Sequence, residues 1–276
     1  MQMTRLTSAD FDKMIIESID EVLAFDKSNG ELIFMFDQVI SGEITSENET
    51  IFAEGRQGVQ LASFDRNKTA GFTCENGYVQ AGAIATQLGT EVRKADGTNG
   101  ISYDVIELKE IKKGATTVDL AQEAYLDDDV PAVKYVYLLA SDGSKAKTFT
   151  YGTAADANKF TAANESNKTT ITLPTDLAKN SDIKIMVQYE AVSSVGQEII
   201  NAGDKYSSNV KLVINFVAQE PCGGNKYLMQ CVMPNAKVSG TFSLSVGDSP
   251  AVQNFEASAL LDVCSVDKEL FVIKMV

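Results

Sequence analysis

The sequence contains no histidine and no tryptophan among its 276 residues. Histidine is the side chain best suited to proton transfer near neutral pH. Without it, the chain cannot build Ser-His-Asp or Cys-His catalytic arrangements, nor a zinc site with histidine ligands. Carboxylate or lysine catalysis is not excluded on this ground. The composition argues against an enzyme, and we predict no catalytic residue, no cofactor and no metal site.

Cysteine and long apolar runs are also scarce. The four cysteines form no C-x-x-C pair, so we expect reduced thiols in or near the core, although a Cys222–Cys231 bond would also close a loop. No stretch of eighteen apolar residues exists, which predicts no membrane span. The opening "MQMTRLTSADFDKM" lacks the apolar region of a secretory signal, so we expect synthesis in the cytoplasm. The other two cysteines are Cys74 and Cys264.

Positive charge is in short supply, with 24 Lys and Arg against 38 Asp and Glu and a formal net charge of −14. Residues 1–60 hold twelve acidic and four basic residues, which gives −8 of that total. Residues 61–95 carry a balance of +1. Such an acidic chain is unsuited to binding nucleic acid through its phosphates. It does suit a wall along which DNA slides without sticking, because negative charge repels the phosphates.

Most of the chain is predicted to be β-strand. Two apolar runs flank Asn29-Gly30, and two more flank Asp142-Gly143, which are strong hairpin signals. With about a dozen short strands separated by polar turns, we predict a mainly β protein built as an antiparallel sandwich or barrel. We expect one domain over residues 1–276, with an inserted or elaborated region near 115–205.

Two helices and two loops are predicted among these strands. Ser8 is a good N-cap for a helix through Phe11, Met14, Ile15 and Ile19. A second, short helix is expected between Asn76 as its cap and Gly89 as its end. We predict a long polar loop or flap at residues 152–169 and an acidic loop at residues 125–131. The triple Asp127–Asp129 in the second loop lacks EF-hand spacing, so we interpret it as solvated charge.

The stretch "VQLASFDRNKTAGFTCENG", Val59 to Gly77, alternates polar and apolar residues on both sides of Arg66-Asn67-Lys68. This pattern predicts a hairpin with a cationic turn. The turn follows directly on the most acidic part of the chain.

These stretches carry a resemblance to a known family. The segment from "DEVLAFDKSNGELIFMFDQV" through "AEGRQGVQLASFDRNKTAGFT" to "YVQAGAIATQLGTEV" resembles the N-terminal part of tail tube proteins of long-tailed bacteriophages. The C-terminal "VMPNAKVSGTFSLSVGDSPAVQNFEASALLDVCSVDKELFVI" is also similar. Together the two ends cover about half of the chain, and the middle section departs from the short form of the family.

The resemblance implies a structural virion protein of the phage tail, made in the host cytoplasm. Such subunits are β-sandwiches with a flanking helix that close into hexameric rings, stack into a hollow tube and line it with negative charge. The implied partners are further copies of the chain, the tape measure protein, and the tail terminator and baseplate proteins. A sheath protein is a further candidate partner. DNA passes through the lumen without specific binding, and no membrane is involved.

The charge partition leads to a prediction for the subunit interface. Open sandwich edges pair with other chains, and head-to-tail contacts between unlike surfaces generate rings and filaments. We expect the basic Arg66 and Lys68 to meet an acidic surface of a neighbouring subunit that includes Glu47, Glu49 and Glu54. A solvated hairpin tip is the alternative interpretation.

Three other functional classes fit less well. A capsid subunit of the common phage type would show a long spine helix, and none is predicted; decoration or baseplate components stay open as virion alternatives. A carbohydrate-binding sandwich would use exposed aromatic side chains, for which nine tyrosines are available. A carboxylate hydrolase needs two paired acids in a cleft, and no pair stands out from the general acidic excess.

Overall fold

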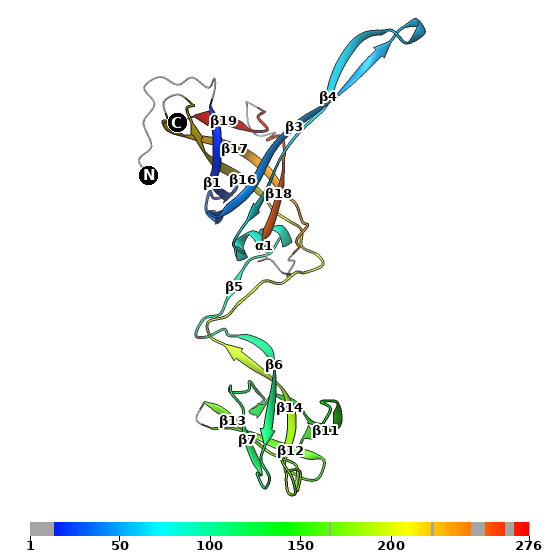
Figure 1. Ribbon diagram of the computed structural model, residues 1–276, viewed down its shortest axis with the longest axis vertical. Helices are drawn as coiled ribbons and strands as arrows, with labels where there is room; N and C mark the ends of the chain where they lie inside the picture. Colours follow the sequence, from blue (N-terminus) through cyan, green and yellow to red (C-terminus); the bar gives the residue numbers. More distant parts are fainter. Residues whose placement is uncertain (1–13, 166, 222–223, 244–251, 263–267, 276) are drawn as a thin grey trace. The chain divides into compact units, whose positions relative to one another are not determined.

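The computed structural model describes residues 14–165, 167–221, 224–243, 252–262 and 268–275 (Figure 1). The chain forms two compact units. The discontinuous unit comprises residues 1–92 and 199–276, and the inserted unit comprises residues 93–198. Each unit has its own sheet and its own hydrophobic core. The prediction of a mainly β, largely antiparallel protein is confirmed.

The discontinuous unit is one antiparallel sheet with the strand order β2-β1-β16-β17-β18-β4-β3, and β19 pairs with β17 beside that path. The hairpin predicted around Asn29-Gly30 is confirmed, because β1 pairs with β2. The strands are β1 (Ile15–Asp26), β2 (Leu32–Phe36), β3 (Val39–Glu54), β4 (Gln60–Asn76), β16 (Asn209–Gln219), β17 (Lys226–Val238), β18 (Gln253–Ala259) and β19 (Val272–Met275).

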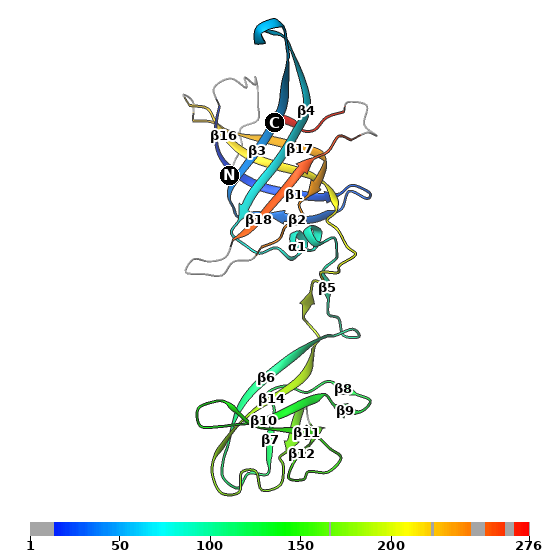
Figure 2. The same cartoon turned by 90° about the vertical axis from the view of Figure 1, so that its right-hand side faces the viewer.

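This sheet curls around its core into a half-barrel (Figure 2). Strands β1 and β3 are not neighbours in the strand order, yet a Cβ added to Gly42 of β3 would lie 2.3 Å from Ile19 Cδ1 of β1. Alternate residues of the strands point into the enclosed space, as period-2 patterning requires. Phe36, Phe72 and Phe255 are fully or almost fully buried there.

The helix predicted from Ser8 through Ile19 is wrong where the structure describes it, since β1 begins at Ile15. Ile15 pairs with Gln219 and Ile19 with Phe216 of β16. β-Branched residues favour strands, and pairing with a buried central strand outweighs the weak helical spacing. The start of the predicted helix lies outside the described residues.

The second predicted helix exists as α1 (Ala81–Leu88), but its predicted cap is wrong. Asn76 ends β4 and is buried; its side chain donates to the carbonyl of Tyr78 at 2.7 Å. The N-cap position is held by Gln80, whose backbone N–H donates to Gln253 Oε1 at 2.6 Å. Gly89 ends the helix with φ of 71°, as predicted.

The inserted unit has a seven-stranded sheet in the order β6-β14-β10-β11-β12-β13-β7, in which only β11 and β12 run parallel among its described strands. The hairpin predicted around Asp142-Gly143 is confirmed as β10–β11. The strands are β6 (Ile101–Ile111), β7 (Thr117–Asp119), β10 (Val133–Leu139), β11 (Lys145–Tyr151), β12 (Lys159–Glu165), β13 (Lys168–Thr172) and β14 (Ile183–Ser193), with the small pairs β5 (Arg93–Lys94) with β15 (Gln197–Glu198) and β8 (Leu126–Asp127) with β9 (Val130–Pro131).

The long loop predicted at 152–169 is too long, because β12 and the start of β13 occupy its second half. Phe160 and Ala162 alternate with exposed residues and are buried in the core of the inserted unit. The small polar residues around them hide this alternation in the sequence. The acidic 125–131 segment is the tight β8–β9 hairpin, with Asp128 and Asp129 both at positive φ in its turn.

Two of the four cysteines lie in described parts of the chain, and both are buried free thiols, as predicted. Burial raises the pKa of Cys231 to about 11. Burial and the neighbouring Glu75 charge raise the pKa of Cys74 to about 12. Both thiols are therefore protonated and unreactive at neutral pH. Cys222 and Cys264 lie outside the described residues.

Gly89 provides a test of how the helix is held in place. It adopts φ of 71°, and an added Cβ would lie 1.9 Å from the carbonyl oxygen of Tyr206. Gly89→Ala is therefore expected to destabilise the discontinuous unit by about 2 kcal/mol or more, measured by chemical denaturation. Gly203→Ala is the matched control, since nothing lies within 4 Å of that added Cβ and its φ is not positive. Equal stability of the two variants would contradict the role assigned to Gly89.

Candidate functional site

The most prominent surface feature is the outer part of the β3–β4 hairpin, which extends past the rest of its sheet (Figures 1 and 2). β4 pairs with β18 only through Gly71–Asn76, so its residues 60–70 pair with β3 alone. Every residue from 46 to 69 except Gly55 is exposed. We call residues 46–69 the ribbon. An isolated two-stranded hairpin is marginally stable in water, so a ribbon of this length is expected to have a partner.

The turn of the ribbon lies at residues 55–59, where the short 3-10 segment η1 (Arg56–Gly58) reverses the chain. The N–H of Gly55 donates to the carbonyl of Val59 at 2.7 Å. Gln57 and Gly58 both adopt positive φ, at 70° and 76°, which glycine tolerates at no steric cost. The cationic turn predicted at Arg66-Asn67-Lys68 is therefore wrong, because these residues lie within β4.

Arg66-Asn67-Lys68 instead forms a β-bulge. Glu47 pairs with Thr69 and Glu49 with Arg66, which leaves one extra residue on β4. Asn67 adopts a φ of 52°, a conformation that asparagine accepts more readily than most residues. A local break of this kind looks like a turn in the sequence, since both place polar residues between alternating stretches.

The bulge is fastened by one carboxylate. Glu49 accepts hydrogen bonds from Arg66 Nη2 at 2.6 Å, from Arg66 Nε at 3.0 Å and from Asn67 Nδ2 at 2.7 Å. The Arg66 bonds first, and then the Asn67 bond, lower the pKa of Glu49 below its usual 4.5. Exposed ion pairs contribute little to global stability, but a two-pronged Arg–carboxylate contact fixes local geometry.

The five predicted interface residues all lie on the ribbon, although not together. Arg66 and Glu49 pair within one chain. Glu47 stands opposite Thr69, and Glu54 stands near the turn opposite Gln60. Lys68 has no ion-pair partner among the described residues. Contact of these five residues with a neighbouring subunit stays a prediction.

Sequence reasoning missed the apolar residues of the ribbon. Ile51 and Phe64 stand opposite each other on one face, and Phe64 is 57% exposed. Phe52 lies on the other face, and Leu61 near the turn is 70% exposed. Alternation predicts strands here, but the number of neighbouring strands decides whether alternate residues are buried. Large apolar side chains on a protruding hairpin are typical of a surface that another molecule covers.

The sheet of the discontinuous unit has open strand edges at both ends of its strand order. β3 pairs only with β4, β2 pairs only with β1, and the first half of β1 pairs only with β16. β3 is the longest of them, with 16 residues. Open edges offer unpaired backbone N–H and C=O groups to another chain.

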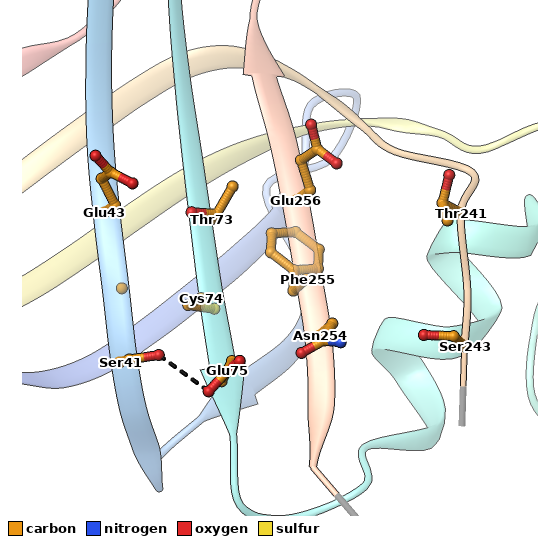
Figure 3. Close-up of a pocket in the computed structure, with 11 residues that line it drawn as sticks. Ser41, Glu43, Thr73, Cys74, Glu75, Thr241, Ser243, Asn254, Phe255 and Glu256 are labelled. Carbon is orange, nitrogen blue, oxygen red and sulfur yellow. Dashed lines mark hydrogen bonds between the residues drawn. The ribbon is translucent and has the colours of Figure 1, made fainter. Parts of the chain in front are cut away.

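The polar face of β3, β4 and β18 is acidic (Figure 3). Glu43 and Glu256 flank Thr73 in one row across the three strands, and Glu75 lies in the next row, where Ser41 donates to it at 3.2 Å. These residues border a cavity of about 490 Å³ whose lining contains no basic side chain. Within the described ranges, no group of three or more Cys, Asp or Glu is arranged to hold a metal ion. The surface can repel anions.

A model of the YomU/Tube protein family matches residues 14–271. The chain belongs to this family. The match confirms the resemblance to phage tail tube proteins, and it makes the protein a structural component of the phage tail and virion. A search of curated proteins finds no match. Helices of the described residues include none long and apolar enough to cross a membrane.

Among solved structures, the tube protein is similar to the backbone protein of pilus 2b of group B streptococcus. The two share 14% sequence identity over 84% of this chain and 78% of that chain, with a TM-score of 0.20. A score this low carries no argument about fold or assembly.

The Glu49 contact gives a pH prediction for the ribbon. The pKa of Glu49 is lowered in the folded chain. Ionised Glu49 therefore stabilises the bulge at neutral pH, and this stabilisation is lost as pH falls through the lowered pKa, below 4.5. Glu49→Gln should reproduce the loss at neutral pH. We expect faster amide exchange across residues 47–69 with an unchanged global melting temperature. Glu47→Gln is the control, and equal exchange in both variants would contradict the assignment.

Proposed function

We propose that this tail tube protein self-assembles into stacked hexameric rings that form the hollow tube through which phage DNA passes. The observation that carries the proposal is the β3–β4 hairpin of a family member: one long open edge, continued by a ribbon without a buried side chain. The ring number of six comes from the resemblance to tail tube proteins.

Within a ring, neighbouring copies close the barrel by strand addition. The open edge of β3 on one copy receives an open edge of the next copy. The open edge of β2 lies at the other end of the same sheet. Unlike edges on one chain give a head-to-tail contact, which closes into a ring when the rotation allows. Backbone hydrogen bonds provide the affinity in this mode, and side chains set the register.

Between rings, the ribbon reaches a neighbouring copy. Contact with that copy buries the exposed apolar side chains of the ribbon. The acidic face of Glu43, Glu75 and Glu256 lines the bore. DNA phosphates are repelled from such a wall and stay hydrated, so the duplex moves with little adhesion. The tape measure protein occupies the lumen during assembly, and terminator, baseplate and sheath proteins are the expected contacts at the ends and outside.

Electron microscopy of the purified protein tests this function. Hollow tubes or six-fold rings at high protein concentration are the expected result. A protein that stays monomeric at every concentration, with no shared sheet in virions, would overturn the proposal.

The ribbon face that carries Ile51 and Phe64 predicts a specific assembly defect. Phe64→Ser removes an exposed aromatic ring whose burial in a contact is worth about 2 kcal/mol per copy. Because the contact repeats on every subunit, we expect tubes to be lost while circular dichroism and melting of the chain stay unchanged. Ser63→Ala, one residue away on the opposite face, is the matched control and should assemble normally. Normal tubes from Phe64→Ser would show that the face is not used.

The predicted electrostatic contact is tested best at Lys68, because reversal of Arg66 would also break its internal pair with Glu49. Lys68→Glu should lower tube stability, and the difference from wild type should shrink at high salt as the charges are screened. The measurement is the salt dependence of tube melting. Lys205→Glu, an exposed lysine elsewhere on the same unit, is the control. Identical melting of Lys68→Glu and wild type at low salt would count against the contact.

A further inference from the structure

The inserted unit carries an exposed face that tube formation as proposed above does not use. Strands β6, β14 and β10 lie side by side, and their registers place two rows of side chains across them. One row is Leu108, Met186 and Tyr137; the other is Ile106, Gln188 and Tyr135. We call these six residues the tyrosine platform.

The platform is separate from the core of its own unit. The alternate residues of β14 and β10, including Ile185, Val187 and Val136, point to the opposite face and are fully buried. On the platform side, Leu108 is 72% exposed and Ile106 is 62% exposed. A contiguous apolar patch of this kind on a sheet face marks an interaction surface.

The platform also presents hydrogen-bonding groups. The rings of Tyr135 and Tyr137 lie side by side, with centroids 5.8 Å apart and planes inclined by 38°. Tyr137 donates to Gln188 Oε1 at 3.4 Å. Within the described part of the chain, the Gln188 amide N–H groups and the Tyr135 hydroxyl have no partner. Apolar surface and free donors therefore alternate over a small area.

Paired charges border the platform on both sides. On one side, Lys134 Nζ lies 2.7 Å from Asp104 and 3.8 Å from Glu190. On the other, Lys184 Nζ lies 3.3 Å from Glu110. The platform residues themselves are uncharged. Lys145 Nζ also lies 5.8 Å from the Tyr137 ring centre. Counted together, Lys134, Lys145 and Lys184 balance Asp104, Glu110 and Glu190, which favours a neutral ligand.

We propose that the tyrosine platform binds a neutral polysaccharide. The C–H faces of sugar rings stack on Tyr135, Tyr137 and the aliphatic row, and sugar hydroxyls hydrogen-bond to Gln188 and to the phenols. A protein partner would have to satisfy the free amide and phenol at isolated points within a dry contact, whereas a sugar offers hydroxyls at every ring. The surface is open, so one copy binds weakly, and many linked copies gain about 10²–10⁴ in avidity.

The test is retention of the purified full-length protein on insoluble cellulose, chitin and cross-linked dextran, with release by the matching soluble oligosaccharide. The proposal predicts retention on at least one of the three. It also predicts about a tenfold weaker association for the double variant Tyr135→Ala/Tyr137→Ala, and a smaller loss for Gln188→Ala. Tyr206→Ala, which removes an exposed tyrosine of the discontinuous unit, should bind as wild type does.

Several results would overturn the proposal. One is wild-type protein that passes through all three matrices. Another is retention that the double variant keeps at full strength while its melting curve matches wild type. A third is self-association of tubes that the double variant abolishes without any polysaccharide binding, which would assign the platform to protein contact. Tube formation is scored separately by microscopy of the same samples, so failure of the proposed function and failure of this inference are distinguishable.

Discussion

The backbone ladder between β3 and β4 is the interaction on which the assembly surface depends. The inner part of β4 is fixed by β18 and by Phe72 and Cys74 in the core, whereas the outer part has only β3 as a neighbour. One continuous strand therefore links the packed half-barrel to a ribbon that has no core. The Glu49 contact holds the bulge, so the register set near the core is carried to the turn. A ribbon with a fixed register presents its exposed apolar side chains at defined positions.

The features that we propose for assembly are also hazards in a free subunit. Open edges and exposed apolar side chains promote unspecific strand pairing. Negative charge on the ribbon opposes such pairing, because its apolar residues are interrupted by Glu47, Glu49, Glu54 and Asp65. A net charge of −14 adds long-range repulsion between copies. Contact then requires a surface that matches both the apolar face and the charges, which favours an ordered neighbour over random aggregation.

The sequence predicts strands well where alternation continues to a glycine-containing turn, as at Asn29-Gly30 and Asp142-Gly143. It fails where long-range pairing decides the outcome. Ile15 and Ile19 have helical spacing, and only their pairing with β16 makes them a strand. The bulge at Asn67 and the true turn at Gln57-Gly58 differ in pairing, which local composition does not report. The charged residues of the candidate surface were accessible to sequence reasoning because charge partition is a property of the chain. Its apolar residues were not, since their exposure depends on how many strands lie beside them.

The inserted unit interrupts the tube fold at little cost to it. Its first and last residues pair with each other, as Lys94 with Gln197 and Arg93 with Glu198, and Arg93 also forms an ion pair with Glu198. The host chain therefore leaves and returns at one place, and a long insertion between two close ends adds little loop-closure entropy. The unit also has a hydrophobic core of its own, built from residues of the inserted segment alone. Selection on its exposed face can then change what it binds without disturbing the edges and the ribbon that we propose build the tube.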